Sequence, residues 1–360
     1  MHLSDFDYEL PEELIAQHPL KQRDASRMLV LNRENQTLTD SKFELFPEYV
    51  RPGDVIVVNN TRVFPARLIG RRDPSGGRVE VLLVRELEDS SAHQPRSRTS
   101  CIWEALVRPA HKLKEGARLR FGDSELRAEV LQSSTKGLRL LRFEHALNER
   151  QPLEAALNEH GQTPLPPYIR RPSGTSAEDK ERYQTVFARE QGAIAAPTAG
   201  LHFTAGVIEA ICARNARVVE ITLHVGYGTF EPVRVDEIEQ HQVAAEFFQI
   251  KEEAATVINN SRGQGGRVIA IGTTTTRALE SAVNAAGQIE AVAKETKLTI
   301  TPGYEFRVTD ALLTNFHLPR SSLLLLVSAF AGRDFTLAAY RHAVAGRFRF
   351  YSYGDCMFVI

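Results

Sequence analysis

Short, continuous apolar runs alternate along the chain with longer segments in which apolar residues recur at helical spacing. Apolar runs of about four to eight residues are typical of buried strands, whereas an apolar face that repeats every three to four residues is typical of a helix. Thr204 and Asp334 are candidate N-caps of two of the helices. We expect strands over 54–58, 218–224, 267–271, 311–313 and 348–353, and helices over 205–214, 252–262, 274–286 and 335–344. This alternation predicts an α/β domain.

The middle of the chain has a different pattern. Several short strands at close spacing, with no helical period between them, predict a small β-barrel. The short and often alternating apolar runs lie at 79–84, 101–107, 118–121, 126–131 and 138–143. We therefore expect an α/β domain made of residues 1–63 and 150–360, with a β-barrel domain inserted over 64–149.

Length and composition agree with two domains, because 360 residues exceed the size at which a single core usually stops growing. No apolar run is long enough to span a membrane, and the acidic N-terminus is unlike a secretory signal. Three widely spaced cysteines favour a reducing compartment over a disulfide framework. We expect a cytoplasmic protein without a membrane partner.

Charge is unevenly distributed, although the formal net charge of the chain is only −1. Residues 64–149 contain 16 Lys and Arg against 12 Asp and Glu, and the remaining residues contain 28 against 33. A local excess of cations suggests a surface that faces phosphates. An ordinary solvated face is the alternative.

Four loops carry mixed polar side chains next to apolar segments, at 195–204, 222–230, 272–277 and 315–322. Loops that are fixed on a rigid scaffold are where binding and catalytic residues concentrate. We interpret the four loops as parts of one active site.

The residues of these loops allow several chemistries. Gly272, followed by four threonines and Arg277, has the context of an anion site at a helix N-terminus, or of an ordinary Thr-capped helix. The three histidines of these loops can be zinc ligands, buried structural residues or a general base. They are His202, His224 and His317.

Nine short runs spread over almost the whole chain form a further pattern. They are 6–11 with 14–17, 59–63 with 65–68, 164–169, 183–187, 197–204, 224–226 with 228–230, 273–274 with 277, 315–319, and 349–350 with 352–355. Together and in this order, the runs closely resemble the S-adenosylmethionine:tRNA ribosyltransferase-isomerase family of queuosine biosynthesis.

The chain departs from the pattern of that family at two positions. Ala244 stands where the family commonly has a second histidine, three residues after the one that matches His241. Thr301 stands where a tyrosine often precedes the Pro-Gly pair that begins at Pro302. The first difference puts in question a catalytic role for the missing histidine.

The resemblance implies a barrel-like α/β domain with an inserted β-barrel, and a transferase that acts on tRNA. In this family the ribosyl part of S-adenosylmethionine is transferred to 7-aminomethyl-7-deazaguanine at the wobble position of a tRNA with a GUN-type anticodon. The ribosyl ring rearranges, which gives epoxyqueuosine and releases adenine and methionine. No metal or organic cofactor is implied. We expect a monomer whose barrel faces the tRNA through Arg71, Arg72, Lys112 and Lys114.

The chemistry of that reaction indicates which residues matter. The sulfonium acidifies the ribosyl 5′ carbon, so a base near neutrality is needed, and we place His317 first, followed by His202 and His224. Asn and Thr side chains suit the ribose hydroxyls, whereas a helix N-terminus or an arginine suits the methionine carboxylate. The expected substrate-binding residues are Asn59, Asn60, Thr61, Arg62, Arg67, Pro197, Thr198, Gly226, Gly228, Thr229, Phe230, Thr273, Thr274, Arg277 and Asn315.

Two other functions stay open at this point. A non-catalytic RNA-binding protein would use the basic barrel and leave the four polar loops without a purpose. A metal-dependent hydrolase would use the three histidines as zinc ligands. Only the transferase releases adenine and methionine together when it is given both S-adenosylmethionine and the deazaguanine-containing tRNA.

Overall fold

The computed structural model describes residues 1–87, 100–122, 126–133, 138–145, 153–172, 174–230 and 233–360. The chain forms two compact units. Unit 1 comprises Met1–Arg62, Pro166–Arg170 and Arg182–Ile360, and unit 2 comprises Val63–Leu165 and Arg171–Glu181. The expected insertion, 64–149, therefore lies within unit 2, which also takes in residues further along the chain.

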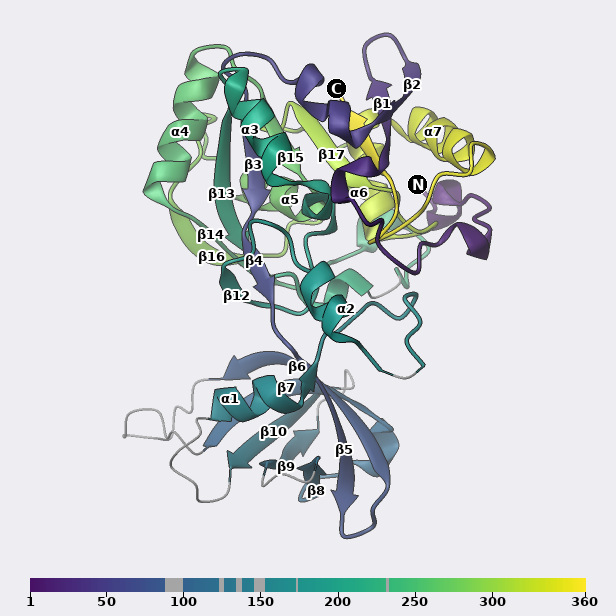
Figure 1. Ribbon diagram of the computed structural model, residues 1–360, viewed down its shortest axis with the longest axis vertical. Helices are drawn as coiled ribbons and strands as arrows, with labels where there is room; N and C mark the ends of the chain where they lie inside the picture. The colour runs from purple at the N-terminus through teal and green to yellow at the C-terminus, as the bar shows by residue number, and fades with distance from the viewer. Residues whose placement is uncertain (88–99, 123–125, 134–137, 146–152, 173, 231–232) are drawn as a thin grey trace. The chain divides into compact units, whose positions relative to one another are not determined.

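Unit 1 is built on a nine-stranded mixed sheet (Figure 1). The strands lie in the order β16 (Val292–Thr296), β14 (Glu246–Ile250), β13 (Arg217–Leu223), β3 (Val55–Asn59), β15 (Val268–Ile271), β17 (Ala311–Asn315), β18 (Cys356–Val359), β1 (Arg27–Asn32) and β2 (Thr37–Lys42). The four strands from β13 to β17 run parallel to one another. Three of them, β3, β15 and β17, are buried along their whole length, as expected of parallel strands that are covered on both faces.

Helices cover both faces of this sheet (Figure 1). Successive side chains of a strand point to opposite faces, so Val55 and Val57 of β3 belong to one core and Ile56 and Val58 to the other. The first core is completed by α4 (Glu252–Gly263), α5 (Thr273–Ala282), α6 (Ser322–Ala331) and α7 (Arg333–Ala345). The second is completed by α3 (Ala205–Ala213) and the 3-10 helix η4 (Phe43–Tyr49).

The predicted elements of unit 1 are largely confirmed, with two corrections. Thr204 caps α3, because its hydroxyl accepts a hydrogen bond from Val207 N at 3.3 Å. Asp334 is not a cap, since α7 begins one residue earlier, after Gly332. The expected strand over 348–353 is wrong, because Tyr351 has a φ of 72° and breaks the extended backbone. The strand lies instead at β18.

Unit 2 confirms the predicted small β-barrel (Figure 1). Six strands pair in the order β5 (Arg67–Asp73), β6 (Arg78–Leu87), β7 (Ser100–Arg108), β10 (Leu138–His145), β9 (Leu126–Ser133) and β8 (Arg118–Phe121). Pairing of β8 with β5 closes the barrel, and β11 (Gly161–Gln162) adds to β5. Apolar side chains alternate inward along these strands and fill the interior, as the sequence pattern indicates.

Short elements connect these parts of the fold. Two of them are the helices α1 (Leu153–His160) and α2 (Ala177–Arg182), and two more are the strands β4 (Thr61–Val63) and β12 (Glu190–Ala193), which form a two-stranded sheet. The others are the 3-10 helices η1 (Leu3–Phe6), η2 (Glu12–Leu14), η3 (Arg23–Ala25), η5 (Ala110–Lys112), η6 (Thr198–His202), η7 (Tyr227–Phe230) and η8 (Ile238–Gln240). No single helix in the described ranges is long and apolar enough to cross a membrane. Helices α6 and α7 pass that test only as a pair, which bends by 115°.

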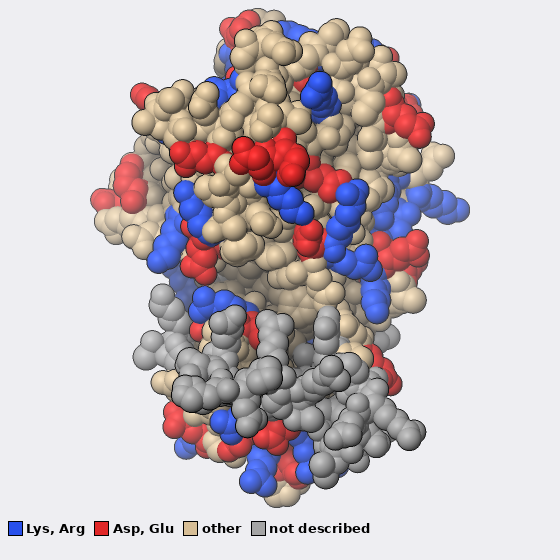
Figure 2. All heavy atoms as spheres, turned by 90° about the vertical axis from the view of Figure 1, so that its left-hand side faces the viewer, with Lys and Arg blue, Asp and Glu red and all other residues tan. Residues whose placement is uncertain are grey.

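Charges of both signs are mixed on the surface of unit 1. Figure 2 shows basic and acidic side chains interspersed on the face that carries α4, β14 and β16. Two of the pairs in this unit join Arg189 to Glu220 at 2.8 Å and Lys251 to Glu190 at 3.6 Å. Such mixing leaves little net field of one sign on this face.

Candidate active site

The carboxyl ends of the four parallel strands of unit 1 meet at one edge of the sheet. The strands end at Leu223, Asn59, Ile271 and Asn315, and polar loops follow each of them. In open α/β sheets, ligands bind outside the carboxyl ends of the strands. The loop around His202 reaches the same edge, because its imidazole contacts Asn315. The structure thus brings together all four loops that the sequence singled out.

The Asn59 and Asn60 carboxamides hold β3 and β13 together at this edge. Asn59 Oδ1 accepts hydrogen bonds from Leu223 N at 3.0 Å and Thr61 N at 3.1 Å, and its Nδ2 donates to Leu223 O at 2.9 Å. Asn60 Oδ1 accepts from Thr222 Oγ1 at 2.8 Å. These contacts give both asparagines a structural role, and contact with substrate stays a prediction for them.

His224 follows β13 and is half-buried. Its Nδ1 lies 2.8 Å from Thr61 Oγ1, and its Nε2 has no hydrogen-bond partner among the described residues. A Cβ at Gly192 would lie 2.8 Å from three atoms of the ring, so a glycine is needed for the backbone to lie against it. The Phe247 ring lies nearly parallel to the imidazole, with centroids 5.8 Å apart. Burial lowers the pKa of His224, and the carboxylate of Glu190 opposes this shift.

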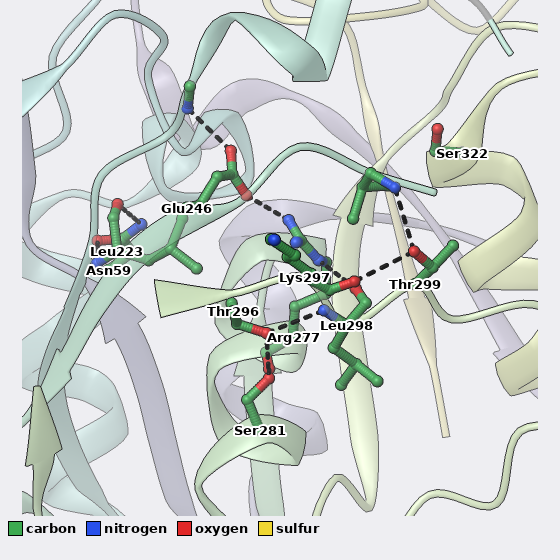
Figure 3. A network of polar contacts seen from close by, with 12 residues as sticks. Asn59, Leu223, Glu246, Arg277, Ser281, Thr296, Lys297, Leu298, Thr299 and Ser322 are labelled. Carbon is green, nitrogen blue, oxygen red and sulfur yellow. Dashed lines mark hydrogen bonds and ion pairs between the residues drawn. The ribbon is translucent and has the colours of Figure 1, made fainter. Parts of the chain in front are cut away.

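A buried ion pair fixes the glycine-rich loop that follows His224 (Figure 3). Glu246 Oε1 accepts a hydrogen bond from Gly226 N at 2.8 Å, and Oε2 forms the ion pair with Arg277 Nη1. Arg277 Nε donates to Leu298 O at 2.9 Å. The Arg277 and Glu246 side chains are only 9% and 4% exposed. Arg277 Nη2 is buried without a partner in the described part of the chain.

The N-terminus of α5 lies at the same edge, directly after β15. Gly272 has a φ of 93°, which lets the chain turn from strand into helix. Thr275 and Thr276 donate their hydroxyls back to the carbonyls of Ile271 and Gly272 at 2.7 and 3.2 Å. The first N–H groups of an α-helix have no acceptor within the helix. Thr273 and Thr274, which begin α5, therefore present donors suited to an anion.

His202 is buried, and both of its ring nitrogens are engaged. Its Nε2 lies 3.2 Å from Asn315 Nδ2, and its Nδ1 lies 3.0 Å from Ser26 Oγ. Because the amide group of Asn315 is a donor, Nε2 accepts and Nδ1 carries the proton. Burial lowers the pKa of His202 to about 4. Asn315 Oδ1 is buried with no partner among the described residues.

His317 is also buried, and a set of hydroxyl groups holds it. Its Nε2 lies 2.8 Å from Thr314 Oγ1, and its backbone N donates to the hydroxyl of Tyr340 at 3.0 Å. The Tyr8 hydroxyl donates to its carbonyl oxygen. Burial lowers the pKa of His317 to about 3.

The geometry therefore distinguishes the three histidines. A general base works best when its pKa lies near the operating pH. His202 and His317 are held neutral by deep burial and are poor proton acceptors at neutral pH. His224 keeps an open ring nitrogen, is oriented through the other one, and remains accessible. This ordering differs from the sequence-based ranking, in which His317 comes first.

The remaining predicted residues lie in varied surroundings. Arg62 is exposed on β4, Pro197 is buried, and Thr198 begins η6 half-buried. Arg67 belongs to unit 2, where its Nε donates to Glu80 Oε1 at 2.8 Å. An ion pair with an acidic neighbour is the alternative to phosphate contact for this arginine.

The second half of the glycine-rich loop is packed closely. A Cβ at Gly228 would lie 2.9 Å from the Cβ of Ala244, the residue that stands where the family commonly has histidine. The backbone of Thr229 and Phe230 closes η7. The side chains of these two residues lie outside what the structure describes, so their predicted role stays a prediction.

Sequence reasoning missed three residues of this site: Glu246, Phe247 and Gly192. No strand was expected where β14 lies, so the buried carboxylate and the exposed ring on that strand were not seen. The run Phe247-Phe248-Gln249-Ile250 is the sequence signal that could have found β14. The burial of Glu246 and the position of Gly192 have no such local signal.

The described residues contain no group of three or more His, Cys, Asp or Glu side chains placed to hold a metal. His202, His224 and His317 each contact different hydroxyl groups, of Ser26, Thr61 and Thr314. The expectation that no metal is needed stays a prediction.

Comparisons with known proteins show what this chain is similar to. The family model described as “Queuosine biosynthesis protein” matches residues 3–359. Among solved structures, the chain is similar to the crystal structure of an S-adenosylmethionine tRNA ribosyltransferase from Thermotoga maritima. The two share 37% sequence identity, with a TM-score of 0.55, and the match covers 99% of this chain and 100% of that one.

Proposed function

The chain belongs to the queuosine biosynthesis protein family, and from this premise we propose that it transfers the ribosyl moiety of S-adenosylmethionine to 7-aminomethyl-7-deazaguanine at the wobble position of tRNA. The transferred ring isomerises, and the products are epoxyqueuosine-tRNA, adenine and methionine. The tRNA substrate carries a GUN-type anticodon. The observation that carries this proposal is the meeting of four polar loops at the carboxyl edge of the parallel strands, in a chain of this family.

We assign the general base of the reaction to His224. The sulfonium acidifies the ribosyl 5′ carbon, and removal of a proton there starts the loss of adenine. An imidazole that is neutral, oriented by Thr61 and open at Nε2 meets the requirements for this step. Gly192 supports the role, because its lack of a side chain leaves room for the ring.

The ring of Phe247 offers a stacking surface beside this base. It is 40% exposed, and it lies nearly parallel to His224. Unpaired nucleobases are commonly held by stacking on aromatic side chains. We assign to Phe247 the stacking of a planar base next to the imidazole.

The methionine carboxylate is assigned to the α5 region. The N-terminus of α5 and the hydroxyls of Thr273 and Thr274 favour an anion there. One turn further along α5, Arg277 keeps its Nη2 without a partner among the described residues. A guanidinium and a helix N-terminus are both suitable for a carboxylate.

We propose that this chemistry needs no metal and no organic cofactor, since S-adenosylmethionine is consumed as a substrate. The proposed compartment is the cytoplasm, which suits Cys101, Cys212 and Cys356, all three of which are free thiols.

The test is to incubate the purified chain with S-adenosylmethionine and a tRNA that carries 7-aminomethyl-7-deazaguanine at the wobble position. Adenine, methionine and the modified nucleoside are measured by mass spectrometry, with a tRNA that has guanine at that position as the control. We expect equal amounts of the three products with the first tRNA and none with the second. Binding of tRNA without product would instead indicate a non-catalytic RNA-binding protein.

A further inference from the structure

Four exposed arginines from four neighbouring strands form one row on the outside of the barrel in unit 2. Arg71 of β5 is paired in register with Arg78 of β6 on one side and with Arg120 of β8 on the other. Arg120 is in turn paired with Arg127 of β9. Residues that are directly opposite each other on antiparallel strands share a face of the sheet. All four side chains are exposed, and the flanking Val79, Leu119, Phe121, Leu126 and Ala128 are buried in the interior.

This row is energetically unfavourable for the isolated barrel. Like charges that face each other across strands are destabilising. None of the four arginines forms an ion pair within the described part of the chain. The row is therefore not explained by the stability of the barrel.

The neighbouring row on the same strands is balanced. Two residues away, Arg118 is paired in register with Asp73 on one side and with Glu129 on the other. Arg67, further along β5, forms an ion pair with Glu80. The barrel thus places acidic residues directly opposite Arg118, whereas the residues directly opposite Arg71 and Arg120 are arginines.

We propose that the row of Arg78, Arg71, Arg120 and Arg127 (the arginine row) binds the phosphate backbone of the tRNA substrate. Adjacent strands lie about 4.8 Å apart, so the row presents regularly spaced guanidinium groups. Guanidinium groups match phosphate oxygens in geometry and keep their charge at all relevant pH values. Such contacts are independent of base sequence and position the nucleic acid. The inference rests on the proposed function, which supplies the polyanionic partner.

The experiment compares the full-length double variant Arg71→Gln/Arg120→Gln with the matched control Arg118→Gln. The control removes an arginine from the same strand and the same face, but one with acidic neighbours. The dissociation constant for the deazaguanine-containing tRNA is measured at several salt concentrations. We expect the double variant to bind about tenfold more weakly or worse, with a slope of log K against log salt shallower by about 1.5, since each lost phosphate contact removes about 0.7 to 0.9. The control should change little.

Stability and turnover separate this role from a structural one. Removing like charges relieves repulsion, so the thermal midpoint of the double variant should stay the same or rise. Turnover at saturating tRNA should be unchanged, while KM for tRNA rises. Unchanged tRNA affinity, or an equal loss in Arg118→Gln, overturns the proposal, and so does a lowered thermal midpoint that accounts for the weaker binding.

Two further arms identify the partner and isolate the proposal from the proposed function. In the first arm, binding to vesicles that contain anionic lipid is measured. If the double variant loses this binding but keeps its affinity for tRNA, the row belongs to a membrane surface and the proposal is overturned. Wild-type protein that binds tRNA through the row but releases no adenine contradicts the transferase and leaves the row standing. Normal turnover in the wild type, together with tRNA binding that does not change in the double variant, supports the transferase and contradicts the role of the arginine row.

Discussion

The two units place their charged side chains in opposite ways. At the edge of the sheet in unit 1, Glu246 and Arg277 are buried and neutralise each other. On the barrel of unit 2, Arg71 and Arg120 are exposed neighbours of like charge. The first arrangement fixes the positions of neighbouring groups, whereas the second creates a positive potential at the surface. A buried charge must find its partner within the chain, and an exposed row of one sign is suited to a partner outside it.

The largest expected difference between the two units is in their stability at acidic pH. The pKa values of His202 and His317 are lowered from 6.5 to about 4 and about 3, so the folded state holds these rings neutral. Their contribution to stability is complete above pH 6.5 and is lost as the pH falls towards 4 and 3, at about 1.4 kcal/mol per pH unit for each ring. The described side chains of unit 2 include no buried histidine. Hydrogen exchange at pH 4.5 should therefore show loss of protection in β17 and η6 before the barrel strands.

A double variant checks the cause. His202→Gln/His317→Gln removes both titrating groups, and its remaining stability should depend less on pH between 6.5 and 4 than that of the wild type. If the barrel strands lose protection first, the difference between the units does not rest on these histidines.

Breaking the buried ion pair should have the next largest effect. Glu246→Gln leaves Arg277 buried and uncompensated, which typically costs about 3 to 5 kcal/mol. The matched variant in unit 2 is Glu80→Gln, whose ion pair with Arg67 is about one-third exposed and is worth less than about 1 kcal/mol. Urea unfolding measures both. Equal losses in the two variants would contradict the contrast drawn between the units.

Replacing His224 should affect turnover more than stability. His224→Gln removes the proposed base, and we expect turnover to fall by about a hundredfold or more, with little change in the unfolding midpoint because the residue is half-buried. His342, which is exposed and contacts Asp40, provides the control His342→Gln. Single-turnover release of adenine is the measurement. Full turnover in His224→Gln, together with a large loss in His317→Gln, would return the role to His317.

A chelator should have the smallest effect of all. Because the proposed chemistry uses imidazole and backbone groups, treatment with a strong chelator should leave the turnover unchanged. Elemental analysis of the active protein provides the second measurement. Activity that is lost with the chelator and restored by zinc would favour the metal-dependent alternative.

Local patterns in the sequence predict much of the fold and the location of the site. The strands β3, β13 and β15 are short apolar runs, and the polar residues directly after them mark where each strand ends. Because parallel strands end at a common edge, their loops converge. The Thr204 cap and the alternating strands of the barrel are local in the same sense.

Properties that depend on packing could not be predicted from the sequence. The sequence does not distinguish His202, His224 and His317 from one another. Only their burial in the structure shows that the ring of His224 is accessible, whereas those of His202 and His317 are held neutral. The residues of β18 are all apolar, so they show no alternation of apolar and polar residues that would predict a strand. The segment before it does alternate, but the positive φ of Tyr351 interrupts its extended backbone. The arginine row depends on strand register, which joins residues from 71 to 127, and of the four residues expected to contact tRNA only Arg71 belongs to it.

The discontinuity of unit 1 has a consequence for synthesis on the ribosome. Strand β3 leaves the ribosome long before β13 and β15, the two strands that flank it in the sheet. Strand β1 pairs with β18, which is made more than 300 residues later. The barrel strands are consecutive, so unit 2 can fold while the chain is still growing.

During translation, therefore, the Val-Ile-Val-Val run of β3 remains an unpaired apolar segment after the barrel has folded. Unpaired apolar strands favour aggregation. The nascent chain should bind chaperones over residues 55–58 until β13 and β15 have been made. Slow synthesis of the segment that carries β13 and β15 would prolong this exposure, and synonymous codons in that part of the gene are expected to influence yield.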